Sequence, residues 1–290
     1  MIEGELTWQQ FKSLDSIRNL NEGQQVQHYY KYLESLNEWI NHQNKGPLVS
    51  NTASGPALLA GSVLFDTPEG SVYYYNTDTN ASTQLNVPNT SSLYANDIAH
   101  TQNKLWLNTT NKISEWNITL NPFTATFSRL IDTPHNIGAG LGAIDDTTLI
   151  TTNISTTPNT VVVLDITNNT ATSTYKFDLT VGGSNRSIAG DILLTTTGKV
   201  ITTNVGGGST YATQYNYSTG IVEVDTQISP TISNAYGLYI ENNNIYVMNF
   251  NGNVYQIDKT SPYTKTLVGN TGTTVYGASQ VPSALTANFS

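Results

Sequence analysis

Two aspartates occupy the same place in similar short stretches of small residues. Asp97 lies in Tyr94-Ala95-Asn96-Asp97-Ile98, and Asp191 lies in Ile188-Ala189-Gly190-Asp191-Ile192. Two carboxylates that face one channel could bind a cation such as Ca²⁺, or act as general acid and general base on a sugar. A third interpretation, which we favour, is that each carboxylate accepts hydrogen bonds from neighbouring backbone amides.

Other residue types give little further chemistry. Comparable stretches carry Leu141, Leu238 and Ala278 at the position of the aspartates, so no third acid is in register with the pair. The chain has no cysteine, which excludes disulfides, thiol catalysis and cysteine–zinc sites. Its four histidines form no metal-binding pattern. We therefore expect no transition-metal site, no cofactor and no catalytic residue.

The elements that would position the aspartates are indicated by a phrase that recurs five times. Its Asn or Asp residues, separated by 41, 48, 51 and 42 residues, are Asn76, Asn117, Asp165, Asn216 and Asp258. Each follows an apolar or aromatic residue, as in Tyr75-Asn76-Thr77 and Leu164-Asp165-Ile166-Thr167. A period of 40 to 50 residues in a β-rich chain is typical of propeller blades. The sequence predicts an all-β, five-bladed β-propeller in which the phrase ends the third strand of each blade.

The predicted ring is closed by the end of the chain. Val275-Tyr276-Gly277-Ala278-Ser279 has the small residues of a first, inner strand, but no blade of its own follows it. We expect it to complete the first blade, which leaves no exposed sheet edge between first and last blades. The alternative is that Pro56-Ala57-Leu58-Leu59 supplies that strand. Small residues suit inner strands because these converge on a narrow axis.

Two segments resemble known propeller repeats. The stretch from Val162 to Thr172, with its apolar strand, Asp165 and Thr-Asn turn, resembles the YVTN-type repeat, and Asn253-Val254-Tyr255-Gln256-Ile257-Asp258 is similar to NHL and lactonase-like blades. The resemblance implies the fold alone. Five-bladed furanosidases are similar in having acids at the channel, but they use three acids in fixed motifs.

The first 46 residues differ from the rest and predict a helical hairpin. They hold 10 of the 33 charged residues, and charge density falls by more than half near Lys45-Gly46-Pro47. We place a domain boundary there, with residues 1–46 as an anchoring segment and residues 47–290 as the propeller. The apolar residues recur at helical spacing, and we expect the following to bind a partner: Trp8, Phe11, Val26, Tyr29, Leu33, Leu36 and Ile40. Homo-oligomerisation through the same seam is the alternative.

Charge and hydropathy exclude several partners. The net charge of −9 and the lack of Lys/Arg clusters argue against nucleic acid. No apolar stretch approaches the roughly 18 residues of a membrane-spanning helix, so we expect no membrane insertion. The first residues carry no basic and apolar pattern of a secretory signal.

Composition leads to a functional hypothesis. The body is rich in Thr, Asn, Ser, Gly and Tyr, as extracellular and virion-exposed surfaces often are. Short stretches of the N-terminal segment, Trp8-Gln9-Gln10-Phe11 and Tyr29-Tyr30-Lys31-Tyr32-Leu33, look like helices of tailed-phage structural proteins. We expect a non-enzymatic virion component, located in the virion, whose residues 1–46 contact other structural proteins while the propeller decorates the particle or contacts a host-surface glycan.

Tyrosines are the residues that could make the glycan contact, because a phenol ring combines an apolar face with a polar tip. Those in predicted strands are Tyr73, Tyr74, Tyr75, Tyr211, Tyr215, Tyr217, Tyr236, Tyr239 and Tyr246. The alternative function is an extracellular, cell-surface or periplasmic lactonase or glycoside-hydrolase-like propeller with chemistry in the axial channel. An enzyme would converge polar residues at one mouth of that channel.

Overall fold

The computed structural model describes most of the chain after residue 55. The described residues are 56–58, 62–88, 90, 95–206, 209–260, 262–282, 285, 287 and 289. The helical hairpin predicted over residues 1–46, its partner-binding residues and the boundary at residue 46 lie outside them. No helix in the described part is long and apolar enough to cross a membrane.

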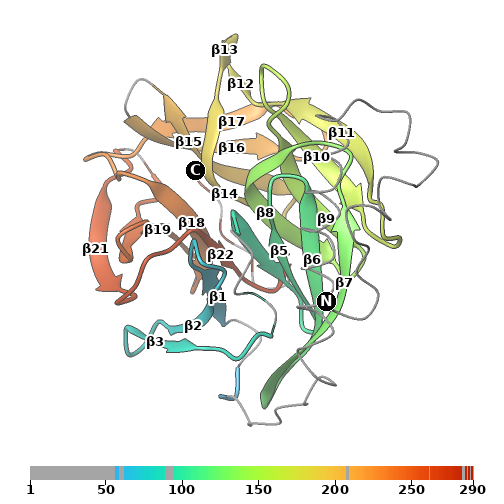
Figure 1. Ribbon diagram of the computed structural model, residues 1–290. Helices are drawn as coiled ribbons and strands as arrows, with labels where there is room; N and C mark the ends of the chain where they lie inside the picture. The colour runs from blue at the N-terminus through green and yellow to red at the C-terminus, as the bar shows by residue number, and fades with distance from the viewer. Residues whose placement is uncertain are drawn as a thin grey trace, which may run out of the picture. The chain divides into compact units, whose positions relative to one another are not determined.

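The described chain forms five four-stranded antiparallel sheets (Figure 1). From the inner to the outer strand, blade one contains β22 (Gly277–Ser279), β1 (Val63–Asp66), β2 (Val72–Asn76) and β3 (Ala81–Gln84). Blade two contains β4 (Asp97–His100), β5 (Lys104–Asn108), β6 (Lys112–Leu120) and β7 (Phe123–Asp132). Blade three contains β8 (Ile137–Asp145), β9 (Thr148–Asn153), β10 (Thr160–Asp165) and β11 (Thr172–Asp178).

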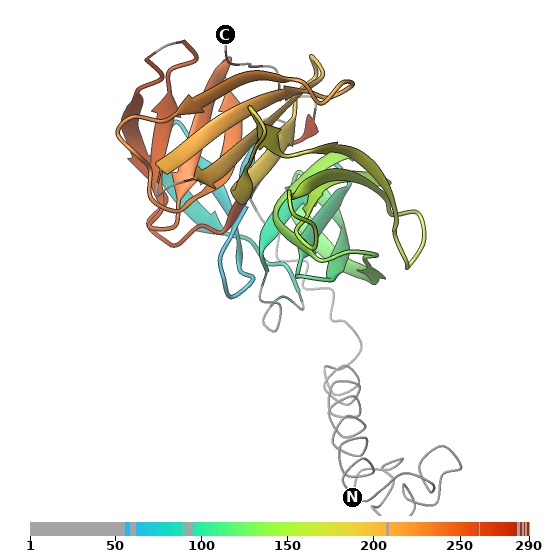
Figure 2. The ribbon, with the colours of Figure 1, turned by 90° about the horizontal axis from the view of Figure 1, so that it is seen from above.

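The last two blades repeat the pattern. Blade four contains β14 (Ser187–Leu194), β15 (Lys199–Gly206), β16 (Ser209–Asn216) and β17 (Val222–Gln227). Blade five contains β18 (Ala235–Glu241), β19 (Asn244–Asn249), β20 (Asn253–Ile257) and β21 (Lys265–Asn270). A short hairpin of β12 (Thr180–Val181) and β13 (Ser184–Asn185) lies between blades three and four in sequence. In Figure 2 the green blades two and three lie on one side of the molecule and the orange blades four and five on the other.

The predicted closure by the C-terminal strand is confirmed. β22 pairs antiparallel with β1 in the register Leu64↔Ser279, Phe65↔Ala278 and Asp66↔Gly277. The alternative inner strand is therefore wrong. Residues 56–58 instead contact blade two, where the amide of Leu58 donates to the carbonyl of Leu120 at 2.7 Å. The first blade is thus built from both ends of the propeller sequence.

The recurring phrase lies on the third strand of every blade, as predicted. In blades one, three and four it also makes the turn: Asn76, Asp165 and Asn216 accept hydrogen bonds from amides two residues further on, at 2.9–3.1 Å. Blade two differs, because β6 continues past Asn117 to Leu120 before the chain turns. Because every blade has four strands, the longest gaps in the phrase spacing do not mark missing strands.

Apolar residues pack between the blades. Five buried clusters fill the five interfaces between neighbouring blades. In order around the ring, starting between blades one and two, they include Leu64 and Ile98, Trp106 and Leu149, Ile150 and Val200, Ile201 and Ile245, and, between blades five and one, Met248 and Phe65. The ring of blades thus encloses a ring of hydrophobic contacts, which is the main source of its stability.

The inner strands approach each other as closely as their small residues permit. A Cβ atom added to Gly277 would lie 1.8 Å from Oδ1 of Asp97, and one added to Gly190 would lie 2.0 Å from the carbonyl oxygen of Ala235. Neither position has room for any side chain. The prediction that inner strands need small residues is borne out by these contacts.

Candidate functional site

Asp97 stands at the start of β4, on the axial side of blade two. Its side chain is fully buried. Oδ1 accepts the amide of Ile98 at 2.7 Å, and Oδ2 accepts the amides of Gly140 and Leu141 at 2.7 and 2.8 Å. Since Gly140 and Leu141 belong to β8, the carboxylate links the inner strands of blades two and three.

Asp191 plays the same part on β14 of blade four, and it too is fully buried. Oδ1 accepts the amide of Ile192 at 2.7 Å, and Oδ2 accepts the amides of Leu238 at 2.9 Å and Ala278 at 3.3 Å. These donors lie on β18 and β22. One carboxylate therefore links three inner strands, including the one that closes the ring.

The five residues placed in register from the sequence meet at the axis. Leu141, Leu238 and Ala278 provide amides, and Asp97 and Asp191 accept them. The axial amides of one blade have no strand of the next blade to pair with, and a buried amide without an acceptor is costly. The two carboxylates supply the missing acceptors.

A third buried acid, Asp66, was missed by sequence reasoning. It ends β1, the second strand of blade one, directly opposite Gly277. Its side chain is fully buried, and neither carboxylate oxygen has a hydrogen-bond partner among the described residues. Burial raises the pKa of Asp66 well above its ordinary value, although the nearby amides of Asp66 and Gly277 lower it in part. Asp66 lies on the second strand of its blade, so the register of the first strands that relates Asp97 to Asp191 does not reveal it.

The three acids influence one another. Burial is the main cause that raises the pKa of Asp97 well above its usual range, and the negative charges of Asp191 and Asp66 raise it further. Burial likewise raises the pKa of Asp191, against the effect of its three amide donors. Acids held in this way favour the protonated form at the axis.

The arrangement fits a structural role better than a chemical one. A general acid must reach its substrate, yet Asp97 and Asp191 are inaccessible to solvent. A cavity of about 510 Å³ lies at the far end of β4, where Thr101, Asp146 and Val281 line it without any of the three axial aspartates. Calcium takes six to eight oxygen ligands, and the described residues hold no group of three or more His, Cys, Asp or Glu that could bind a metal.

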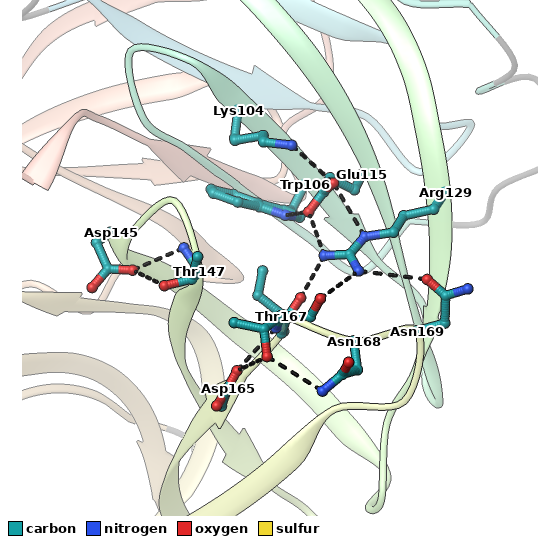
Figure 3. A network of polar contacts seen from close by, with 11 residues as sticks. Lys104, Trp106, Glu115, Arg129, Asp145, Thr147, Asp165, Thr167, Asn168 and Asn169 are labelled. Carbon is teal, nitrogen blue, oxygen red and sulfur yellow. Dashed lines mark hydrogen bonds and ion pairs between the residues drawn. The ribbon is translucent and has the colours of Figure 1, made fainter.

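Glu115 organises a second polar network, at the boundary of blades two and three (Figure 3). The carboxylate accepts Lys104 Nζ at 3.0 Å, and Trp106 Nε1 and Arg129 Nη2 at 3.2 Å each. Burial acts to raise the pKa of Glu115, but hydrogen bonds from these three residues outweigh it and hold that pKa below its ordinary value.

Arg129 carries the network into blade three. Its guanidinium donates to the carbonyl of Thr167 at 3.0 Å and also to that of Ile166, both in the turn after β10. Asp165 fixes the same turn through the amide and hydroxyl of Thr167, as Figure 3 shows. The network thus connects blade two to the recurring turn of blade three, and its role is structural.

Comparison with known proteins adds the fold and no identity. No family model matches the chain, and no curated protein matches it in sequence. Among solved structures, the nidogen/laminin complex contains a chain that is 11% identical, with a TM-score of 0.52 and coverage of 77% of this chain and 98% of that one. The β-propeller domain of Cps50 (Swd1) from Myceliophteria thermophila is 10% identical, with a TM-score of 0.43 and coverage of 71% and 67%. The five four-stranded sheets, closed by the pairing of β22 with β1, make this chain a five-bladed β-propeller.

Proposed function

We propose that this chain is a non-enzymatic structural and binding protein, a virion component that displays its propeller for decoration or for contact with a host-surface glycan. The observation that carries the proposal is the sealed axis. Where a propeller enzyme would present accessible acids, Asp97 and Asp191 are buried and accept three backbone amides each. In this proposal a ring whose described axial acids are all buried acts through its outer surface.

In this proposal residues 1–46 anchor the protein to other structural proteins of the particle. The segment is denser in charge than the rest of the chain and carries an apolar helical seam. The pairing of β22 with β1 closes the ring within the described residues. This closure supports the proposal that the propeller is a module separate from the anchor.

Deletion of residues 1–46 tests the anchoring role. We expect the shortened chain to remain folded, to keep its β-type circular dichroism while losing the helical contribution of residues 1–46, and to be absent from purified particles. A matched variant, Asp132→Asn on the exposed rim of blade two, should be incorporated normally. Normal incorporation of the shortened chain would refute the anchoring role.

The hydrolase or lactonase alternative has a weaker basis. It requires an acid that reaches a substrate, and the accessible acids nearest the strand ends, Asp145 and Asp165, serve their own turns by accepting the amides of Thr147 and Thr167. The hydrogen bonds from those threonines explain both aspartates as turn residues.

A further inference from the structure

Most of the tyrosines considered for ligand contact are occupied within the propeller. Tyr75, Tyr215 and Tyr239 are core residues with at most 1% exposure. The other occupied rings are stacked on an aromatic neighbour or covered by a cation: Tyr73 on Phe65, Tyr246 on Tyr239, Tyr211 under Arg186 and Tyr217 under Lys176. Tyr236 differs from these because both of its ring neighbours, Phe250 and Tyr276, are themselves half-buried and not core residues.

That group, called here the aromatic cluster, consists of Tyr236, Phe250 and Tyr276. Ring centroids lie 5.3 Å apart for Tyr236 and Tyr276, 6.0 Å for Phe250 and Tyr276, and 6.3 Å for Tyr236 and Phe250. All three side chains are half-buried. Tyr236 lies near the start of β18 and Tyr276 immediately before β22, so the cluster spans the junction at which the ring closes.

Backbone hydrogen bonds hold the cluster in place before any ligand arrives. The amide of Phe250 donates to the carbonyl of Asn234 at 2.9 Å, and the amide of Tyr276 donates to the carbonyl of Asp66 at 2.9 Å. Asn234 itself has a left-handed φ of 53°, which Asn tolerates better than most residues. Rings fixed in this way lose little conformational entropy on binding.

The spacing of the rings selects the kind of ligand. Centroids 5.3–6.3 Å apart mean that the rings touch each other, so no cation fits between them as in an aromatic cage. The cluster instead offers an apolar surface of ring faces and ring edges, because the three ring planes are inclined at 55–86° to one another. The hydroxyls of Tyr236 and Tyr276 have no hydrogen-bond partner among the described residues. Asn234, two residues before Tyr236, and Asn251, directly after Phe250, are exposed.

An apolar surface of aromatic rings that carries two phenol hydroxyls matches one face of a sugar ring, which presents C–H groups framed by hydroxyls. No described cation lies over these three rings to favour an acidic sugar. We propose that the aromatic cluster is a binding site for a neutral pyranose of a surface glycan. The inference rests on the proposed display function and assigns the glycan contact to one place on the propeller.

Saturation-transfer NMR on the full chain tests the site. The probes are the methyl pyranosides of glucose, galactose, mannose and N-acetylglucosamine. We expect transfer to the ring C–H protons of at least one sugar, and about tenfold weaker binding after Tyr236→Ala or Tyr276→Ala. Tyr236→Leu, which keeps apolar volume and loses the ring, should weaken binding as much while the fold is retained. Tyr175→Ala, at a 60% exposed tyrosine of β11, is the matched control and should bind normally.

Two results would overturn the assignment: no transfer to any of the four sugars, or transfer that the Tyr236 and Tyr276 variants leave unchanged. Either of these leaves the anchoring role standing, because particle incorporation is measured separately. Conversely, sugar binding together with normal incorporation of the chain lacking residues 1–46 would refute the anchor and keep the site.

Discussion

At the scale of single residues, the axial acids act as acceptors for backbone amides. Asp97 and Asp191 together satisfy six amides, four of them on inner strands of other blades. Charged or neutral, a carboxyl group provides acceptor oxygens where a ring of separate sheets lacks them. Asp66 differs, because both its oxygens are buried without a partner in the described chain.

Asp66→Asn should change how stability depends on pH. Since burial raises the pKa of Asp66, the folded protein keeps this proton at pH values where the unfolded chain has released it. Wild-type stability contributed by this group is therefore complete below about pH 4 and falls as pH rises. We expect the free energy of unfolding of Asp66→Asn, relative to wild type, to rise between pH 4 and pH 8. Denaturant titrations of both proteins at several pH values would measure the difference, and parallel curves would contradict it.

His100 changes the pH dependence of stability in the opposite direction to Asp66, so the two proteins are compared with each other at each pH. Burial lowers the pKa of His100 to about 3. The unfolded chain therefore binds this proton first, and stability falls as pH drops from about 6.5 towards 3. His100 also contacts Ser279 of the closing strand, with 2.8 Å between Nδ1 and Oγ. Its effect is common to both proteins and cancels in their difference.

At the scale of elements, closure depends on how tightly β22 fits against β4. Gly277→Ala would place a Cβ atom 1.8 Å from Oδ1 of Asp97 and 2.9 Å from its Cα atom. We expect the free energy of unfolding to fall by about 3 kcal/mol or more, because the backbone must move to relieve the overlap. Gly272→Ala is the control: its φ of 75° costs about 1–2 kcal/mol, and its Cβ would meet nothing within 4 Å. Equal losses, measured by thermal unfolding, would contradict a tightly packed closure.

The junction of blades two and three gives a second prediction at this scale. Glu115→Gln weakens the partner of Lys104 and Arg129 in a site where the carboxylate is only 2% exposed. The side chains of Lys104 and Arg129 are about one quarter exposed, so solvent screens part of their attraction to the carboxylate. We therefore expect the free energy of unfolding to fall by about 2 kcal/mol. Lys112→Met breaks the exposed pair with Asp132 and should cost less than about 0.5 kcal/mol. A Glu115→Gln protein as stable as Lys112→Met would show that the network is dispensable.

The repeated strands and turns could be predicted from the sequence, whereas the sites formed by pairing of distant strands could not. The phrase at Asn76, Asn117, Asp165, Asn216 and Asp258 placed the third strands because turns use local hydrogen bonds. The burial of Asp66 follows from its pairing with Gly277, more than 200 positions away, and no local pattern reveals it. The aromatic cluster likewise joins residues from three separate segments. The expected anchor over residues 1–46 stays a prediction.

At the scale of the whole molecule, the propeller is a closed ring whose five interfaces are filled by apolar clusters. Its axis is sealed by carboxylates bonded to backbone amides, and the half-exposed aromatic cluster lies at the closing junction. In the proposed display role, surface groups held on such a ring would lose little conformational entropy on binding. We expect the axis of such a ring to open only when the whole propeller unfolds.

Amide hydrogen exchange on the full chain tests whether the axis opens only by global unfolding. The amides of Ile98, Leu141, Ile192 and Leu238, all bonded to axial carboxylates, should exchange only through global unfolding and be among the slowest in the protein. Amides of the exposed outer strand β21 should exchange far sooner and serve as an internal reference. Exchange of the axial amides as fast as those of β21 would mean an open channel, and the sealed-scaffold account would be wrong.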